Sequence, residues 1–158
     1  MLASRGNSRS SNRKQGGKQG GFSLLEVLIA VLVLSVGLLG MAALQINAMK
    51  NNQSSYQRTQ AVMLSYFMLD AMRTNRGDVA DGNYDMAKTC AVPVAGGSLV
   101  SGDQHFWMQA LKNNLGNDNA TCGEIDCTGM TCTVRIYWRD DRGTGGATQQ
   151  MFETASGL

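Results

Sequence analysis

An 18-residue run without a charged or amide side chain, from Val27 to Leu44, constrains this chain of 158 residues more than any other feature. A helix over this run would be about 27 Å long at about 1.5 Å per residue, close to the roughly 30 Å hydrocarbon core of a bilayer. A single domain of this size has no interior that could surround such a helix on every side. The run therefore predicts a membrane-spanning helix rather than a buried core helix.

Charge is segregated along the chain. Residues 1–21 carry no acid and five basic side chains, which are Arg5, Arg9, Arg13, Lys14 and Lys18. This basic segment predicts that the N-terminus stays in the cytoplasm and that everything after the apolar run lies outside it. Residues 3–21 also lack large apolar side chains, so we expect them to be disordered. Residues 22–158 sum to a charge of −3 and offer no basic surface, so no nucleic-acid partner is expected.

Beyond the apolar run, no Pro and no Gly occurs between Leu44 and Gly77. We expect one continuous helix from Phe22 to about Asn75, about 80 Å long, whose second half projects from the membrane. Apolar residues recur in this helix at three- and four-residue spacing. This spacing predicts an apolar stripe along one helix face that another part of the protein must pack against. The stripe comprises Ile46, Met49, Tyr56, Met63, Phe67 and Ala71, with Leu64, Met68 and Met72 beside them.

The remaining chain predicts a small mixed domain. Residues 103–116 are typical of a short helix with Asp103 as its N-cap and Gly116 as its end. Its inward-facing residues would be Phe106, Trp107, Ala110 and Leu111.

Residues 131–138 alternate between apolar and polar side chains, which indicates a half-buried strand with Cys132, Val134, Ile136 and Trp138 on one face. A turn over 139–146, in which Gly143, Gly145 and Gly146 are available for positive φ, and the segment 147–155 complete a hairpin. The predicted class is α+β, with a small antiparallel sheet laid on the outer half of a long N-terminal helix.

The four cysteines all lie in the part expected outside the cytoplasm. Cys90, Cys122, Cys127 and Cys132 are an even number in an oxidising compartment, which favours disulfides over a zinc site. Four cysteines allow three pairings. A bridge from Cys90 would close the longest loop, and Cys132 could pair with either Cys122 or Cys127.

Glu26 is the one charged residue at the head of the apolar segment. An unpaired carboxylate in hydrocarbon costs at least about 2.5 kcal/mol on insertion scales, and such groups usually mark a functional pairing. Glu26 could instead lie at headgroup level as a first-turn acid favoured by the helix dipole. If the chain is cut before Phe22, the new α-amino group supplies the cation that Glu26 would pair with.

The sequence KQGGFSLLEVLIA resembles the class III signal sequence of type IV pilins and type II secretion pseudopilins. A basic leader ends in Gly21, Phe22 follows, and the fifth residue after the junction is Glu26. The resemblance implies cleavage between Gly21 and Phe22 by a prepilin peptidase on the cytoplasmic side, and methylation of the Phe22 amine. The apolar stretch is retained, unlike that of an ordinary signal peptide.

Further segments resemble the PilV-type minor pilins, also called type IV pilus modification proteins. They are LSVGLLGMAALQ, DAMRTNRGD, DQHFW with Leu111, and CTVRIYWRD. The resemblance implies a type IV pilin fold. It also implies that the protein is not an enzyme and binds no cofactor or metal. It divides the chain into a cleaved leader (1–21), the membrane-spanning and polymerisation half of the helix (22–44), its periplasmic half (45–76) and a disulfide-containing head (77–158).

By this resemblance the protein is a minor pilin that primes pilus assembly and sits at or near the pilus tip, supporting piliation, adhesion and twitching motility. Its partners would be other minor pilins, the major pilin, the inner-membrane assembly platform and, where present, a tip adhesin. It would reside in the inner membrane before assembly and on the cell surface afterwards. A type II secretion pseudopilin is the nearest alternative. A DNA-uptake pilin and a signal-anchored periplasmic enzyme are further ones, although no GxSxG, HExxH or complete phosphate loop occurs.

Overall fold

The structure is a computed structural model that describes residues 20–141 and 148–158. The prediction that the leader is disordered concerns mainly residues 1–19, which lie outside the described residues. The predicted turn glycines Gly143, Gly145 and Gly146 also lie outside them. The chain divides into two compact units, Met1–Met41 and Ala42–Leu158, which are described separately below.

Helix α1 runs from Leu24 to Thr74 without interruption. The prediction of one helix from Phe22 to about Asn75 is therefore confirmed to within two residues at its start and one at its end. Within the first unit every helical residue is exposed. An 18-residue window of α1 has a mean hydropathy of 2.8 with none of it buried, so the helix is long and apolar enough to cross a membrane.

The second unit contains the head. After α1, the short helix α2 covers Arg76–Ala80 and strand β1 covers Met86–Thr89. Helix α3 then spans Leu99–Leu115. The chain ends with strands β2 (Cys122–Thr128), β3 (Thr131–Trp138) and β4 (Gln150–Gly157).

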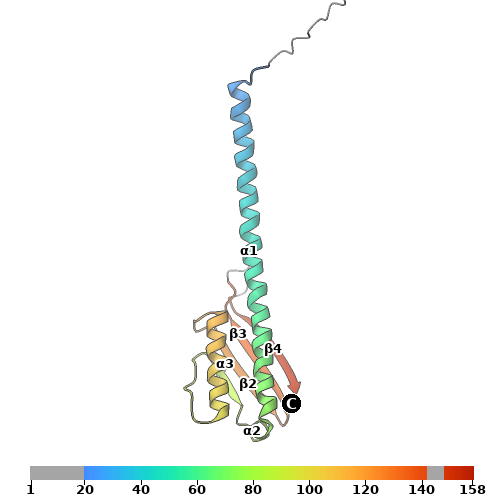
Figure 1. The fold of residues 1–158 in the computed structure, drawn as a ribbon, viewed down its shortest axis with the longest axis vertical. Coiled ribbons are helices and arrows are strands. Elements are labelled where there is room, and N and C mark those ends of the chain that lie inside the picture. The colour runs from blue at the N-terminus through green and yellow to red at the C-terminus, as the bar shows by residue number, and fades with distance from the viewer. Residues whose placement is uncertain (1–19, 142–147) are drawn as a thin grey trace, which may run out of the picture. The chain divides into compact units, whose positions relative to one another are not determined.

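The four strands form one antiparallel sheet in the order β1-β2-β3-β4. Figure 1 shows α3 and the C-terminal part of α1 side by side in front of this sheet. The structure thus confirms an α+β, pilin-like fold in which a long N-terminal apolar helix packs on a small antiparallel sheet. The alternation predicted for residues 131–138 is confirmed, since the inward side chains of β3 are all buried: Cys132, Val134, Ile136 and Trp138.

The core lies between the two helices and the sheet. Its largest fully buried side chains are Trp107, Trp138, Tyr84, Met68, Leu69 and Met72. The indole Nε1 of Trp107 donates a hydrogen bond to the Leu64 carbonyl of α1 at 2.9 Å, which fixes α3 against α1. Gly123 of β2 makes room for this ring, because a Cβ there would lie 2.5 Å from the nearest Trp107 atom.

The predicted stripe on α1 is partly wrong. Met68 and Met72 are buried, but the other buried residues of α1 are Ala61, Ser65 and Leu69. Most of the stripe is exposed: Ile46, Met49, Tyr56, Met63 and Phe67. The outer half of α1 carries apolar residues on two faces, so three- and four-residue spacing alone could not show which face the head covers.

The predicted details of the α3 helix also need correction. The helix begins at Leu99 rather than after Asp103, and Ser98 is its N-cap, with its hydroxyl accepting a hydrogen bond from the Ser101 amide. Asp103 instead accepts a hydrogen bond from Tyr84. Trp107 and Leu111 are buried as predicted, but Ala110 is only half-buried and Phe106 is exposed. Gly116 ends the helix as predicted, at a φ of 131°.

Candidate functional site

The junction before α1 is built from non-helical residues. Gly20, Gly21 and Phe22 precede the helix, and the Phe22 side chain is 83% exposed. Ser23 begins the helix, because its hydroxyl accepts a hydrogen bond from the Leu25 amide and its carbonyl accepts one from the Glu26 amide. The Gly21-Phe22 bond therefore lies in accessible, irregular backbone directly before a capped helix, where a protease could bind it.

Glu26 lies in the first turn of α1, where a carboxylate is favoured by the helix dipole. Its side chain is exposed, and none of the described residues forms an ion pair or hydrogen bond with the carboxylate. Glu26 and Phe22 line the same shallow, mostly apolar groove on the helix surface, together with Val27, Ala30, Val31 and Leu34. The groove thus combines one negative charge with an apolar surface.

All four cysteines are paired, as Cys90–Cys122 and Cys127–Cys132. The sequence left three pairings open. The first disulfide joins the segment after β1 to the start of β2. The second closes the hairpin between β2 and β3, where Gly129 in the turn has a φ of 60°.

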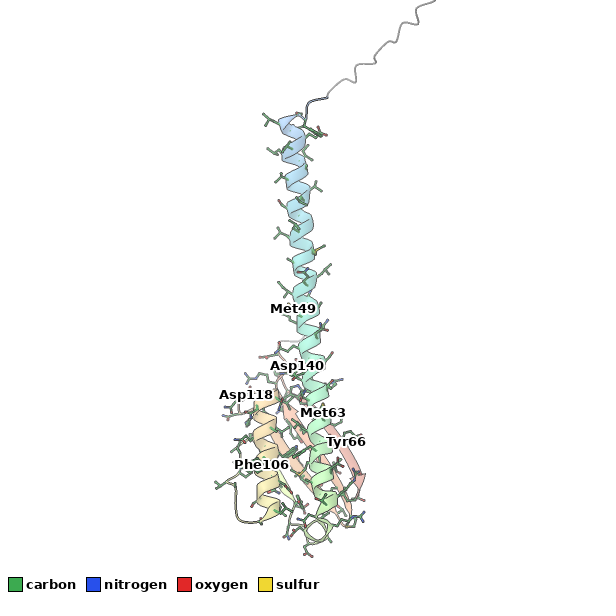
Figure 2. The ribbon with its side chains drawn as sticks, in the orientation of Figure 1. Met49, Met63, Tyr66, Phe106, Asp118 and Asp140 are labelled. Carbon is green, nitrogen blue, oxygen red and sulfur yellow. A yellow bond between two sulfur atoms is a disulfide. The ribbon has the colours of Figure 1, made fainter. Side chains whose placement is uncertain are left out.

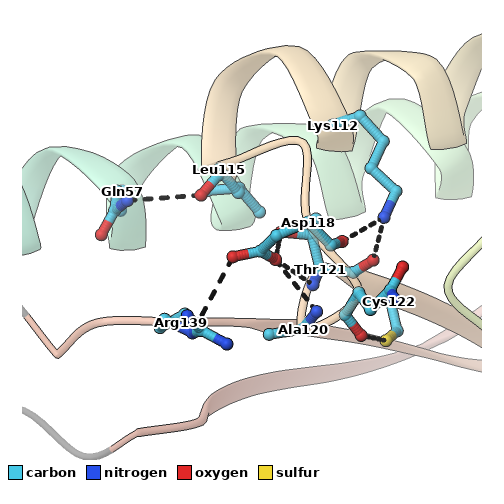
Figure 3. A network of polar contacts seen from close by, with 9 residues as sticks. Gln57, Lys112, Leu115, Asp118, Ala120, Thr121, Cys122 and Arg139 are labelled. Carbon is cyan, nitrogen blue, oxygen red and sulfur yellow. Dashed lines mark hydrogen bonds and ion pairs between the residues drawn. The ribbon is translucent and has the colours of Figure 1, made fainter.

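A polar network connects α1, α3 and the loop that precedes β2 (Figure 3). Lys112 of α3 is buried and donates hydrogen bonds to the carbonyls of Asp118 and Thr121. Burial lowers the pKa of the Lys112 ammonium below its usual value. Gln57 of α1 donates to the Leu115 carbonyl at 3.4 Å, so this network also holds the end of α3 against α1.

Asp118 organises the loop within this network. Burial opposes ionisation of its carboxyl, but hydrogen bonds from the amides of Ala120 and Thr121 outweigh burial and lower its pKa below the usual value. Arg139 lies 3.9 Å away and adds to the effect. The network fixes a loop conformation and presents no catalytic pair.

Tyr84 forms a second polar contact at the other end of α3. The side chain is fully buried and its hydroxyl donates to Asp103 at 2.7 Å. Burial, followed by this contact with the carboxylate, raises the pKa of Tyr84 to about 12. Sequence reasoning missed this pair because it read Asp103 as a helix cap.

The outer face of the sheet carries a charged cluster around Arg135. The guanidinium lies 2.5 Å from Glu153 and 2.9 Å from Glu124, which also accepts a hydrogen bond from Tyr137. All of these groups are paired across neighbouring strands, which is the usual pattern of a solvent-facing sheet. Within residues 20–141 and 148–158, no cluster of three or more His, Cys, Asp or Glu side chains could hold a metal ion.

The geometry therefore directs attention to the N-terminal junction, and a comparison with known families agrees. Residues 16–42 match the prokaryotic N-terminal methylation motif. This motif covers Gly21, Phe22 and Glu26 and ends within the apolar half of α1. No curated protein and no solved structure was found to match the chain.

The motif supports a type IV pilin-like protein, that is, a pilin or pseudopilin that is a substrate of prepilin peptidase. Proteins with this motif are structural subunits rather than enzymes, and they assemble with other pilins. The apolar helix α1, together with the motif, fits anchoring in the inner membrane before assembly. The PilV-type assignment rests on the resemblance of the other segments.

Proposed function

We propose that this protein is a minor pilin of the type IV pilus, of the PilV type, that primes pilus assembly and sits at or near the tip. The observation that carries the proposal is the junction: an exposed, non-helical Gly21-Phe22 bond directly before a capped apolar helix with an acid in its first turn. Prepilin peptidase would cut this bond and methylate the Phe22 amine. The protein would support piliation, adhesion and twitching motility.

The proposal divides the chain into a leader (1–21), a polymerisation segment (22–44), a periplasmic half-helix (45–76) and a head (77–158). In the membrane, the polymerisation segment contacts lipid on all sides. During assembly these contacts are exchanged for contacts with the helices of neighbouring subunits. Every residue of this segment is exposed, which supports the exchange.

Glu26 would then pair with the Phe22 ammonium of a neighbouring subunit. A charge pair in a low-dielectric helix bundle is stronger than one on a surface, but it must first offset the desolvation of both groups. The main contribution of the pair is therefore axial register between subunits. The groove that Glu26 shares with Phe22 supports this role, because its apolar lining would exclude water from the pair.

The outer half of α1 also supports assembly. Its buried face packs on the head, whereas Met49, Tyr56, Met63 and Phe67 remain exposed. Exposed apolar residues gathered on one helix face mark a protein contact. The proposed role as a minor pilin requires three kinds of partner: the other minor pilins, the major pilin and the assembly platform.

N-terminal sequencing and measurement of the intact mass test the proposal most directly. Full-length protein is isolated from membranes of matched strains with and without prepilin peptidase. We expect a methylated mature chain starting at Phe22 in the first strain and an uncut chain in the second. An uncut chain in both strains would contradict the proposal and favour a signal-anchored protein.

A second experiment tests the role of Glu26 and the system that uses the protein. We expect Glu26→Gln to leave cleavage and membrane insertion intact but to reduce the amount of protein in sheared pili at least tenfold, because the charge pair is lost. Glu26→Asp serves as the matched control and should retain part of the incorporation. Wild-type protein absent from pili but required for secretion would favour the pseudopilin alternative.

A further inference from the structure

The two edges of the sheet in the head differ in how well they are protected. At one edge, β1 is four residues long, its register with β2 shifts between Met86 and Thr89, and it carries Lys88. A short strand, an irregular register and a lysine are usual means of blocking unwanted strand pairing. At the other edge, β4 has eight residues, no Pro and no Lys, and it pairs with β3 in unbroken register. Strand β4 therefore has none of these protections.

The register of the sheet shows which backbone groups of β4 point away from β3. Thr131 lies opposite Gly157, and one residue further on the Leu158 amide donates a hydrogen bond to the Met130 carbonyl at 2.9 Å. The backbone of Leu158 thus points to the β3 side. Backbone groups alternate in direction along an antiparallel strand, so three residues within β4 direct both their amide and their carbonyl outward: Met151, Glu153 and Ala155.

These outward backbone groups have no partner within residues 20–141 and 148–158. No hydrogen bond from the described residues reaches the amides or carbonyls of Met151, Glu153 and Ala155, and all three residues are exposed. A row of free N–H and C=O groups along a sheet edge is a template for an added strand. The edge therefore specifies the class of partner, which is an extended polypeptide.

An aromatic side chain of α1 lies on the β4 side of that helix. Arg73 of α1 donates a hydrogen bond to the Ser156 hydroxyl of β4 at 2.8 Å, so this side of α1 faces β4. Tyr66 precedes Arg73 by seven residues, or two helical turns, and therefore lies on the same side. Figure 2 labels Tyr66 on the β4 side of α1. Its side chain is 52% exposed.

Phe152 of β4 lies at a similar level. Figure 1 shows that α1 and β4 run toward the same end of the head. Tyr66 lies about 10 Å before Arg73 along α1, and Phe152 lies about 13 Å before Ser156 along β4. Phe152 packs against the core but is only half-buried. A strand added at this edge would remove more of both aromatic rings from water.

The edge also predicts the side chains of the added strand. Glu153 is the one charged residue of β4, and its side chain is 48% exposed. A residue directly opposite Glu153 projects on the same face of the sheet, so a Lys or Arg is favoured there. The residues on either side of that cation project to the other face, toward Tyr66 and Phe152, where apolar side chains fit.

A second copy of this chain is a poor source of the strand. Residues 77–158 carry ten acids and five bases, so two heads repel each other. Two β4 strands paired in register would also bring their Glu153 side chains together. The assembly face of α1, which includes Phe67, stays free for other pilins, because Tyr66 is displaced from Phe67 by about 100° around the helix.

We propose that the β4 edge accepts a strand from a different protein. The added strand runs antiparallel to β4, as all neighbouring strands of this sheet do. It places a Lys or Arg opposite Glu153 and an apolar residue on each side of that cation. This contact goes beyond the proposed function, because it uses the sheet of the head and not the helix through which pilins assemble.

A synthetic strand tests the proposal on the full-length protein in detergent. The labelled peptide is Val-Thr-Val-Lys-Val-Thr-Val, whose Lys is placed opposite Glu153. We expect saturable binding by fluorescence anisotropy and slower amide hydrogen exchange, measured by NMR, at Met151, Glu153 and Ala155. Methylation of the Lys amide, which points toward β4, should weaken binding about tenfold. Methylation of the following Val amide, which points away from β4, is the matched control and should leave binding unchanged.

Variants of β4 separate strand addition from general apolar binding. Ala155→Pro removes an outward amide without removing a hydrogen bond to β3, and should weaken binding about tenfold. Ala155→Val keeps that amide and should bind like the wild type. Glu153→Lys should reverse the preference, so that the peptide with Glu in place of Lys binds more tightly. Thermal unfolding of each variant checks that the head remains folded.

Photo-cross-linking in cells identifies the source of the strand. With p-benzoylphenylalanine in place of Met151, we expect adducts with a different protein that are lost in Ala155→Pro and kept in Ala155→Val. Adducts between two copies of this chain, adducts that survive Ala155→Pro, no adducts at all, or equal binding of the two methylated peptides would overturn the proposal. Peptide binding does not depend on cleavage after Gly21, so its failure would leave the proposed function intact.

Discussion

Residues 24–44 and residues 61–72 belong to one helix and are both rich in apolar side chains, yet the chain itself buries only the second stretch. Every residue of the first stretch is exposed, whereas Ala61, Met68, Leu69 and Met72 are fully buried against the head. Apolar composition shows only that a surface will be removed from water. Whether lipid, a neighbouring subunit or the same chain removes it depends on what packs nearby.

The largest expected effect on the stability of the head comes from a matched pair of substitutions, one in each stretch. Leu69→Ala removes a fully buried side chain and should destabilise the head by about 2–5 kcal/mol. Leu34→Ala removes the same atoms from the exposed stretch and should change head stability by less than about 0.5 kcal/mol. Urea unfolding followed by tryptophan fluorescence in detergent measures both. Equal effects would show that the first stretch is also covered by the chain.

A change in the opposite direction adds atoms instead of removing them. Gly123→Ala places a Cβ 2.5 Å from Trp107 and 2.8 Å from the Met108 sulfur, so we expect a loss of about 1–3 kcal/mol from overpacking. Gly157→Ala at the end of β4 meets nothing within 4 Å and should be close to neutral. Thermal unfolding of both variants compares them. A neutral Gly123→Ala would mean that the core beneath α3 is loosely packed.

The pH dependence of the head sharpens the contrast, because the head buries the phenol of Tyr84, whereas every described residue of the first stretch is exposed. The pKa of Tyr84 is raised from 10.0 to about 12 in the folded state, so its contribution is complete below pH 10 and is lost as the pH rises from 10 to 12. We expect a loss of roughly 2 kcal/mol across this window. Tyr84→Phe should reduce that slope in unfolding experiments, and Tyr137 sets the remainder because burial and its hydrogen bond to Glu124 also raise its pKa. A variant with the wild-type slope would contradict the assignment.

The smallest expected effect concerns the two helix starts. Ser98→Ala removes the cap of α3 and should cost the head about 1 kcal/mol. Ser23→Ala removes the corresponding contact at the start of α1 and should leave head unfolding unchanged. Ser98→Asp is the conservative control and should restore the stability. Destabilisation of the head by Ser23→Ala would show that the stability of the head depends on the start of α1.

The sequence predicted most of what depends on local pattern. The length of α1 followed from the apolar run up to Leu44 and from the absence of Pro and Gly between Leu44 and Gly77, and β3 followed from strict alternation in residues 131–138. The end of α3 at Gly116 was predicted in the same way. The motif around Gly21, Phe22 and Glu26 was recognisable because its residue types and spacing are unusual in combination.

What the sequence could not predict depends on tertiary contacts. Strand β2 was missed because its Gly123 and acidic residues mask any alternation, and its partners are set by the sheet. Phe106 was predicted to face inward because it lies at helical spacing from Ala110, but its side chain is exposed. Asp103 looked like a cap, but its carboxylate is engaged by a tyrosine 19 residues earlier in the chain. In each case a distant residue decided the outcome.

The disulfide between Cys90 and Cys122 has a mechanical consequence for a protein of this kind. It encloses α3 in a covalent loop, so the backbone path from α1 to β4 crosses from one sulfur to the other without passing through that helix. A tensile force applied along this path would be carried by the disulfide while α3 remained unloaded. A subunit built in this way could keep its α3 surface folded under traction even as the strands beside it began to separate.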